Sequence, residues 1–164
     1  MTNAIKEFIE NNITLIESEH WDEVFSVAAK TLYTTETRKL FEVLTEVFPE
    51  LWHSITTIPP VYSDMQGTLE IPNNITKITS NAFEDSQLSK VIIPRSVTFI
   101  GRMAFSGCDN LTDVYIPSTV IKIQEFAFSS CPKLTIHYEE ELLPSTWSRK
   151  WNSGHRPIKY GSTF

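Results

Sequence analysis

Hydrophobic positions recur along the second half of the chain with a period of 22–23 residues. The stretch IPRSVTFIGRMAFSGCDNL at residues 93–111 is followed by IPSTVIKIQEFAFSSCPKL at residues 116–134, and a shorter copy, IPNNITKITSNAFEDSQL, occupies residues 71–88. A fixed period of this length is typical of solenoid proteins, in which each repeat covers the apolar face of the next. The pattern therefore predicts stacked coils, none of which would be stable alone.

Aligning the copies places equivalent residues in columns. The first copy supplies Ile71, Ile75, Ile78, Ala82, Phe83 and Leu88 to these columns. The runs at residues 91–93 and 114–116 end at proline, which lacks the N–H of a strand ladder, so each predicts a short strand. A second extended piece is expected at residues 97–100 and 120–123, and the Ala-Phe pair is expected to begin a helical turn.

Side chains that carry most enzyme chemistry are few and scattered. Cys108 and Cys131 occupy one column of the repeat, where a buried structural thiol fits better than a catalytic or metal-binding one. The four histidines show no metal-ligand spacing. No glycine-rich phosphate loop, nucleophile elbow or HExxH motif occurs. We therefore expect no enzyme activity, no cofactor and no metal.

The first 55 residues change to helical spacing. Apolar stripes predict three short amphipathic helices, with the stripes Ile5, Phe8 and Ile9; Trp21, Val24, Phe25 and Ala28; and Leu40, Val43, Leu44 and Val47. Asn3 is the expected N-cap of the first helix; Thr34 or Thr35 opens the third, which closes near Pro49. Helices of about ten residues are marginal in isolation, so we expect them to pack on one another and on the first coil.

The pattern I-P-x-x-V-x-x-I-x-x-x-A-F-x-x-C-x-x-L resembles the BspA-type leucine-rich repeat, a bacterial and phage variant of that repeat. The resemblance covers residues 69–138 and implies an α+β fold, a short right-handed solenoid of about three coils with stacked parallel strands. Residues 139–164, with Trp147 and Trp151, are similar to the segment that caps such proteins. We expect an N-terminal helical cap over residues 1–55. A linker or degenerate half-coil is expected over residues 56–68, where Ile58-Pro59 echoes the Ile-Pro of the repeat.

The charge of the chain is unevenly distributed. Its net charge of −6 comes entirely from residues 1–60, which hold ten acidic and four basic residues, whereas residues 61–164 hold ten of each. Such a split suggests two physically distinct segments. The tail after Glu141 carries four cations and no acid: Arg149, Lys150, Arg156 and Lys159. With its aromatic residues, this tail makes nucleic-acid binding an alternative function, although the acidic net charge argues against it.

The chain shows no membrane or export signal. No apolar run approaches the roughly 18 residues that a bilayer-spanning helix needs. The segment MTNAIKEFIENN lacks the basic and apolar regions of a secretory signal. We therefore expect a cytoplasmic protein without a membrane partner. Many proteins with this repeat are secreted adhesins, so a surface adhesin is a further alternative.

Side chains between the inward positions of a strand point outward, so each coil contributes to exposed columns. One expected column is Glu70, Ile92 and Tyr115, continuing to His137 or Tyr138. A neighbouring column is Lys77, Phe99 and Lys122, with Ile121 beside it. Exposed apolar members indicate a contact surface, to be covered by another protein, a second copy or the helical segment.

These expectations combine into one functional hypothesis. We expect a non-enzymatic protein–protein interaction module that acts inside a bacterial cell and binds a protein partner or a second copy of itself. The stretch IKEFIENNITLIESEHWDEVF at residues 5–25 resembles N-terminal segments of phage-type proteins with this repeat. That resemblance implies a phage-encoded protein whose target is a host defence or regulatory protein.

Overall fold

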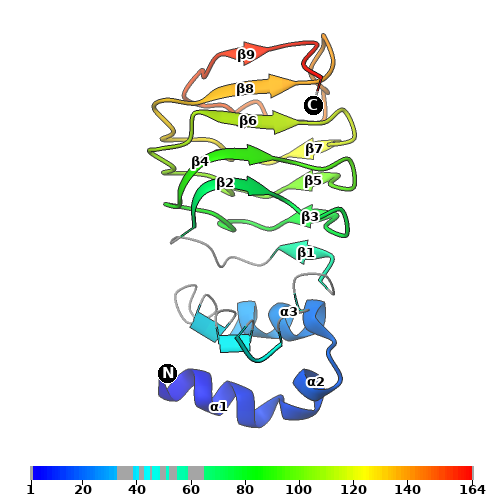
Figure 1. The fold of residues 1–164 in the computed structure, drawn as a ribbon, viewed down its shortest axis with the longest axis vertical. Coiled ribbons are helices and arrows are strands. Elements are labelled where there is room, and N and C mark those ends of the chain that lie inside the picture. Colours follow the sequence, from blue (N-terminus) through cyan, green and yellow to red (C-terminus); the bar gives the residue numbers. More distant parts are fainter. Residues whose placement is uncertain are drawn as a thin grey trace.

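A helical segment leads into an elongated β-solenoid in the computed structural model, which describes residues 2–32, 39–40, 43–44, 46–48, 51, 55–58 and 65–163 (Figure 1). The larger sheet contains, in order, β2 (Gln66–Glu70), β4 (Gln87–Ile92), β6 (Asp113–Ile116), β8 (Thr135–Tyr138) and β9 (Ile158–Lys159). The smaller sheet contains β1 (Thr57–Ile58), β3 (Lys77–Ile78), β5 (Phe99–Ile100) and β7 (Lys122–Ile123). The predicted solenoid of stacked coils is confirmed.

Every strand pair is parallel, and equivalent residues of successive coils lie side by side. Ile78 pairs with Ile100, and Ile100 pairs with Ile123. The Ile-Pro positions are joined as well, since the backbone N–H of Ile93 donates to the carbonyl of Tyr115 at 3.1 Å. This register is what the repeat period of the sequence predicts.

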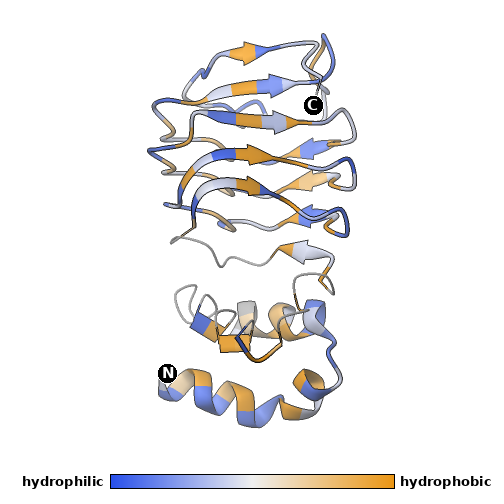
Figure 2. Ribbon diagram, in the orientation of Figure 1, coloured by the Kyte–Doolittle hydropathy of each residue, from blue (hydrophilic) through white to orange (hydrophobic). Residues whose placement is uncertain are grey.

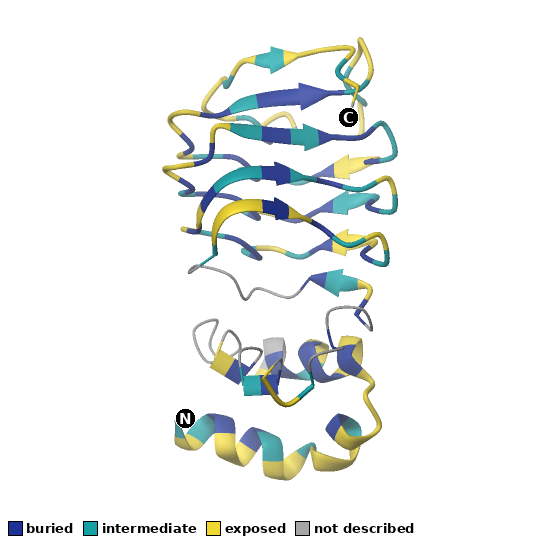
Figure 3. Ribbon diagram, viewed as in Figure 1, coloured by how far each residue is buried: buried dark blue, intermediate teal, exposed yellow. Residues whose placement is uncertain are grey.

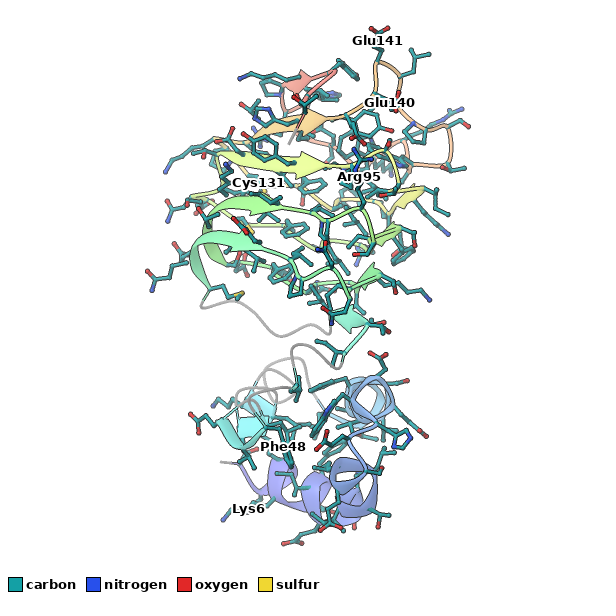
Figure 4. All side chains as sticks on the ribbon, turned by 45° about the vertical axis from the view of Figure 1, so that its right-hand side comes forward. Lys6, Phe48, Arg95, Cys131, Glu140 and Glu141 are labelled. Atoms are coloured by element: carbon teal, nitrogen blue, oxygen red, sulfur yellow. The ribbon has the colours of Figure 1, made fainter. Side chains whose placement is uncertain are left out.

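The two sheets enclose one hydrophobic core, which side chains from both sheets fill (Figure 4). Hydrophobic and hydrophilic residues both occur along the strands (Figure 2). The inward members of the core are Leu69, Val91, Val114 and Ile136 from the larger sheet and Ile58, Ile78, Ile100 and Ile123 from the smaller sheet. The phenylalanines of the repeat form a ladder through this core. The rings of Phe83 and Phe105 stack at 5.0 Å between centroids, and those of Phe105 and Phe128 at 5.3 Å.

The third side of each coil is a hydrogen-bonded turn, so the expected helical turn at the Ala-Phe pair is wrong. Backbone N–H groups of this side donate to the next coil, as Phe83 does to Ala104 at 2.7 Å and Phe105 to Ala127 at 2.8 Å. Two positions per coil have positive φ, namely Asn81 and Asp85, Met103 and Gly107, and Phe126 and Ser130. Because these residues are in the left-handed region, alternate backbone N–H groups point toward the neighbouring coil and donate to it. In a continuous helix the same N–H groups would donate to carbonyls of their own coil.

The N-terminal segment begins with α1 (Asn3–Asn11), α2 (Ile13–Glu17) and α3 (Trp21–Thr31). The N-cap of α1 is Thr2, whose hydroxyl accepts from the N–H of Ile5, so the expectation of Asn3 is wrong. The short helix α2 was not predicted. Residues 39–40, 43–44, 46–47 and 51 are also helical. No helix of the described residues is both long and apolar enough to span a bilayer.

The third predicted stripe is only partly correct. Leu40 and Leu44 are buried, whereas Val47 is 64% exposed and does not belong to the packed face. The expected ends of this helix at Thr34 or Thr35 and at Pro49 lie outside the described residues.

Helix α3 lies between α1 and the first strand of the solenoid (Figure 1). The carboxylate of Asp22 accepts hydrogen bonds from the backbone N–H groups of Thr56 and Thr57, both at 3.2 Å. Strand β1 then pairs with β3, and Ile58 aligns with Ile78. Ile58 therefore occupies the column of the second extended piece, not the Ile-Pro column that its sequence suggested.

Two tryptophans lie against the last coil. Trp151 meets Phe128 edge to face at 6.0 Å and so continues the phenylalanine ladder. Trp147 packs on Tyr138 at 5.1 Å, and its indole N–H donates to the carbonyl of Val120 at 2.9 Å. Both tryptophans are 6% exposed, so they cover apolar surface that the last repeat would otherwise expose. The boundaries predicted for the four segments of the chain stay predictions.

Candidate protein-binding surface

The register of the strands aligns the residues of each predicted column. The larger-sheet column contains Glu70, Ile92, Tyr115 and His137, which are consecutive partners in the register of β2, β4, β6 and β8. The smaller-sheet column contains Lys77, Phe99 and Lys122, from β3, β5 and β7. The two columns were expected to be neighbours, and this is wrong because they belong to different sheets on either side of the core. The protein therefore has two separate candidate surfaces.

Exposure changes along the larger sheet. Strand β2 is largely exposed, whereas three of the four residues of β8 are buried (Figure 3). Within the column, Glu70 is exposed, Ile92 and Tyr115 are partly exposed, and His137 is only 8% exposed. The accessible part of this column therefore lies on β2, β4 and β6. His137 was expected to be an outward contact residue, and its burial contradicts that expectation.

The burial of His137 has a clear cause in its neighbours. Its ring stacks on Tyr115 at 4.3 Å between centroids, with 8° between the planes. Its Nε2 lies 2.7 Å from Oδ1 of Asp113. On the other side of Tyr115, the ammonium of Lys90 lies 4.8 Å from the ring centroid, which is a cation–π contact. Tyr115 is thus held in one orientation and presents a rigid aromatic surface.

Asp113 and Lys90 were not predicted as parts of this surface. Each lies two residues before a member of the column, so the period of two along a strand could have identified them. Burial opposes ionisation of Asp113. Hydrogen bonds from Thr112 and His137 and the charges of His137 and Lys159 nevertheless hold the pKa of Asp113 below its usual value.

A surface cavity of about 340 Å³ opens beside Ile92. Glu70, Asn73 and Arg95 supply polar groups to its wall, and Ile92 and Pro94 supply apolar ones. A carboxylate and a guanidinium thus border an apolar hollow. Such a combination suits one apolar side chain of a partner together with polar groups around it.

Arg95 has a second role at this edge. Its guanidinium pairs with the carboxylate of Glu139, which also accepts from the backbone N–H of Ser118 at 2.9 Å and from the Ser118 hydroxyl at 2.6 Å. The contact ties the second repeat to the segment after β8. Glu140 and Glu141 follow on an exposed loop at the C-terminal end of the solenoid (Figure 4).

The smaller-sheet column is basic and aromatic. Lys77 and Lys122 are exposed, Phe99 is partly exposed, and the ammonium of Lys122 lies 6.0 Å from the centroid of the Phe99 ring. Ile121, next to Lys122, is 63% exposed. A cavity of about 320 Å³ adjoins Lys122 and is also lined by Arg102.

The BspA type leucine rich repeat region, a family model of 6 copies, matches residues 62–143, which is half of the chain. The chain belongs to the BspA-type leucine-rich repeat family. No curated protein and no solved structure matches it. At a period of 22–23 residues the matched span holds between three and four coils.

The basic tail of this BspA-type protein does not present its tryptophans as a stacking surface. Trp147 and Trp151 are buried against the last coil, whereas Tyr160 is 47% exposed. Arg149 and Lys150 are exposed, and the ammonium of Lys150 lies 5.8 Å from the ring centroid of Phe126. Nucleic-acid binding by base stacking on the two tryptophans would therefore require the end of the solenoid to open.

The two cysteines of the BspA-type repeat are free and buried. The thiol of Cys108 donates to the carbonyl of Phe83 at 3.2 Å, and that of Cys131 donates to Phe105 at 3.0 Å. Contact with Cys108, together with burial, raises the pKa of Cys131. In the part of the chain that the structure describes, no three His, Cys, Asp or Glu residues could hold a metal ion.

Proposed function

We propose that the protein is a non-enzymatic interaction module whose protein partner binds across the coils at Ile92 and Tyr115. One observation carries this proposal: a rigid, partly exposed pair of apolar and aromatic side chains lies at the centre of a sheet face. Repeat solenoids present such extended surfaces as binding sites. Tyr115 is already ordered by Lys90 and His137, so binding would cost little side-chain entropy there.

The cavity beside Ile92 indicates what such a partner presents. An apolar side chain in the cavity would contact Ile92, while Glu70 and Arg95 would accept and donate hydrogen bonds at its border. Central apolar anchors surrounded by polar contacts supply most of the binding energy in protein interfaces. We therefore infer a partner with one apolar or aromatic anchor flanked by a basic and an acidic residue.

We further propose that this binding takes place inside a bacterial cell. The two free thiols are compatible with a reducing compartment. The resemblance of residues 5–25 to phage-type proteins supports a phage-encoded protein whose partner is a host defence or regulatory protein. Identification of the captured partner tests this part of the proposal.

The test compares capture of proteins from a bacterial lysate by the full chain and by two variants. Ile92→Asp with Tyr115→Asp places two carboxylates on the proposed surface. Ile121→Asp places one carboxylate on an exposed residue beside strand β7 of the smaller sheet and serves as the control. A protein captured by the parent chain and by Ile121→Asp, but lost with the double variant, would support the proposal.

The captured protein is then purified and its affinity for each variant is measured by titration calorimetry. We expect the double variant to bind the partner at least about 100-fold more weakly than the parent chain does. This corresponds to a loss of roughly 3 kcal/mol of binding free energy, which is typical when a central contact is removed. Equal affinity for the parent and the double variant would show that the partner binds elsewhere.

A further inference from the structure

The described strands of the smaller sheet carry positive charge. Among the described strands of this sheet, the charged residues are Lys77 and Lys122, and neither takes part in an ion pair of the described residues. Phe99 lies between them in the register, with its ring partly exposed. Asp22, at the helical end of the sheet, already accepts from the N–H groups of Thr56 and Thr57.

A surface of opposite character lies on the helical segment. Glu10 and Glu17 are exposed, and Ile13 between them is 45% exposed. Glu10 lies near the end of α1, and Ile13 and Glu17 lie in α2, so the three residues surround the joint between the two helices. Helices α1 and α2 meet at Asn12, whose φ of −122° and ψ of 20° are not helical. The joint is nevertheless compact, because the N–H of Asn12 donates to Phe8 and its carbonyl accepts from Ile16.

The two surfaces are opposite in charge, and each carries an apolar side chain. Lys77 and Lys122 are two strands apart, which corresponds to about 10 Å in a sheet. Glu10 and Glu17 lie on either side of the joint between α1 and α2. An apolar side chain lies between the charges in both surfaces, Phe99 in one and Ile13 in the other.

We propose that the protein self-associates, with the Glu10–Ile13–Glu17 surface of one copy bound to the Lys77–Phe99–Lys122 surface of another. The chain itself supplies this acidic occupant, since residues 1–60 hold the whole net charge of −6. Ile121, 63% exposed beside Lys122, extends the apolar part of the contact. This contact uses neither Ile92 nor Tyr115 and so goes beyond the proposed function.

The contact joins two different surfaces, so each copy offers one of each. Its ion pairs are solvent-exposed and are screened by salt. The mass of the full chain in sedimentation equilibrium should therefore rise with protein concentration at low salt, and should rise less at high salt.

Charge reversal gives the decisive experiment. Lys77→Glu with Lys122→Glu, and separately Glu10→Lys with Glu17→Lys, each place like charges across the contact. Each double variant should associate with itself roughly tenfold to 100-fold more weakly than the parent chain. An equimolar mixture of the two double variants pairs opposite charges again, so its association should return toward that of the parent.

Lys133→Glu with Lys159→Glu is the matched control, because it changes the net charge equally at exposed residues away from the smaller sheet. Restored association in the mixture, with a control that associates like the parent chain, supports the proposal. A parent chain that stays monomeric at low salt overturns it. So does a mixture that stays monomeric, or salt-dependent binding of a single-stranded oligonucleotide by the monomeric parent chain through Lys77 and Lys122.

The two proposals fail independently. Ile92→Asp with Tyr115→Asp should leave self-association unchanged, whereas Lys77→Glu with Lys122→Glu should leave the affinity for a partner at the larger sheet unchanged.

Discussion

Nε2 of His137 lies 2.7 Å from Oδ1 of Asp113 on the adjacent strand of the larger sheet. The hydroxyl of Thr112 donates to the other carboxylate oxygen at 2.8 Å. Both contacts favour the ionised carboxylate, and together with nearby positive charge they outweigh the burial that opposes it. The stability of this face should therefore depend on pH.

Asp113→Asn should destabilise the fold at neutral pH by about 1 kcal/mol, as expected for a charge-assisted hydrogen bond in a partly solvated position. The folded-state pKa of Asp113 lies below its ordinary value of 3.8. The carboxylate thus stabilises the fold fully above pH 3.8, and this contribution disappears as the pH falls through the lower folded-state pKa. Urea unfolding at neutral pH and near pH 3 measures the difference.

Asp109→Asn, which removes an exposed carboxylate, is the control for this experiment. A destabilisation by Asp113→Asn that is the same at both pH values would contradict the assignment.

Gly101 lies where one coil passes very close to another. A Cβ atom at this position would lie 2.4 Å from the backbone nitrogen of Ser80, although the φ angle of Gly101 is not in the left-handed region. Gly101→Ala should therefore destabilise the fold by at least about 2 kcal/mol, because backbone atoms of a stacked coil must move. Chemical unfolding monitored by tryptophan fluorescence measures this loss.

Gly67→Ala provides a matched comparison. Gly67 has a φ of +73° and open space around its Cβ position, so only backbone strain of about 1 kcal/mol opposes the alanine. Gly101→Ala should be clearly the more destabilising of the two. The reverse order would mean that coil stacking at Ser80 tolerates displacement.

Phe105 occupies the middle of the phenylalanine ladder and is fully buried. Phe105→Ala should lower the free energy of unfolding by about 3–5 kcal/mol, because it leaves a cavity between two stacked rings. Phe99→Ala removes the same atoms from a partly exposed position and should cost clearly less. Equal losses would indicate that the ladder does not hold the coils together.

The fold was largely predictable because the repeat constrains it several times over. A column such as Ile78, Ile100 and Ile123 has three independent members, and only one register buries all of them. The turns were less predictable. Met103 and Phe126 adopt positive φ although their residue types disfavour it, because hydrogen bonds to the next coil determine the backbone there.

The candidate surface was only partly predictable from the sequence. Periodicity identified which side chains point outward, but it carries no information on what covers them. His137 points outward and is nevertheless buried, because Tyr115 and Asp113 lie against it. The helical segment lacks a repeat, and there the short helix α2 and the exposure of Val47 were missed.

Trp151 is positioned to protect the open end of the solenoid. Its ring lies over Phe128 and packs against Trp147 at 4.9 Å. Trp151→Ala should remove about 3–5 kcal/mol of stability and uncover the last member of the phenylalanine ladder. Exposed apolar surface and strand edges favour aggregation, so light scattering should increase on mild heating well before it does for the parent chain.

Tyr160→Ala, at a residue 47% exposed in the same segment, should change neither the stability nor the light scattering appreciably. If both substitutions had equal effects, the end of the solenoid would be protected by the segment as a whole and not by the indole of Trp151.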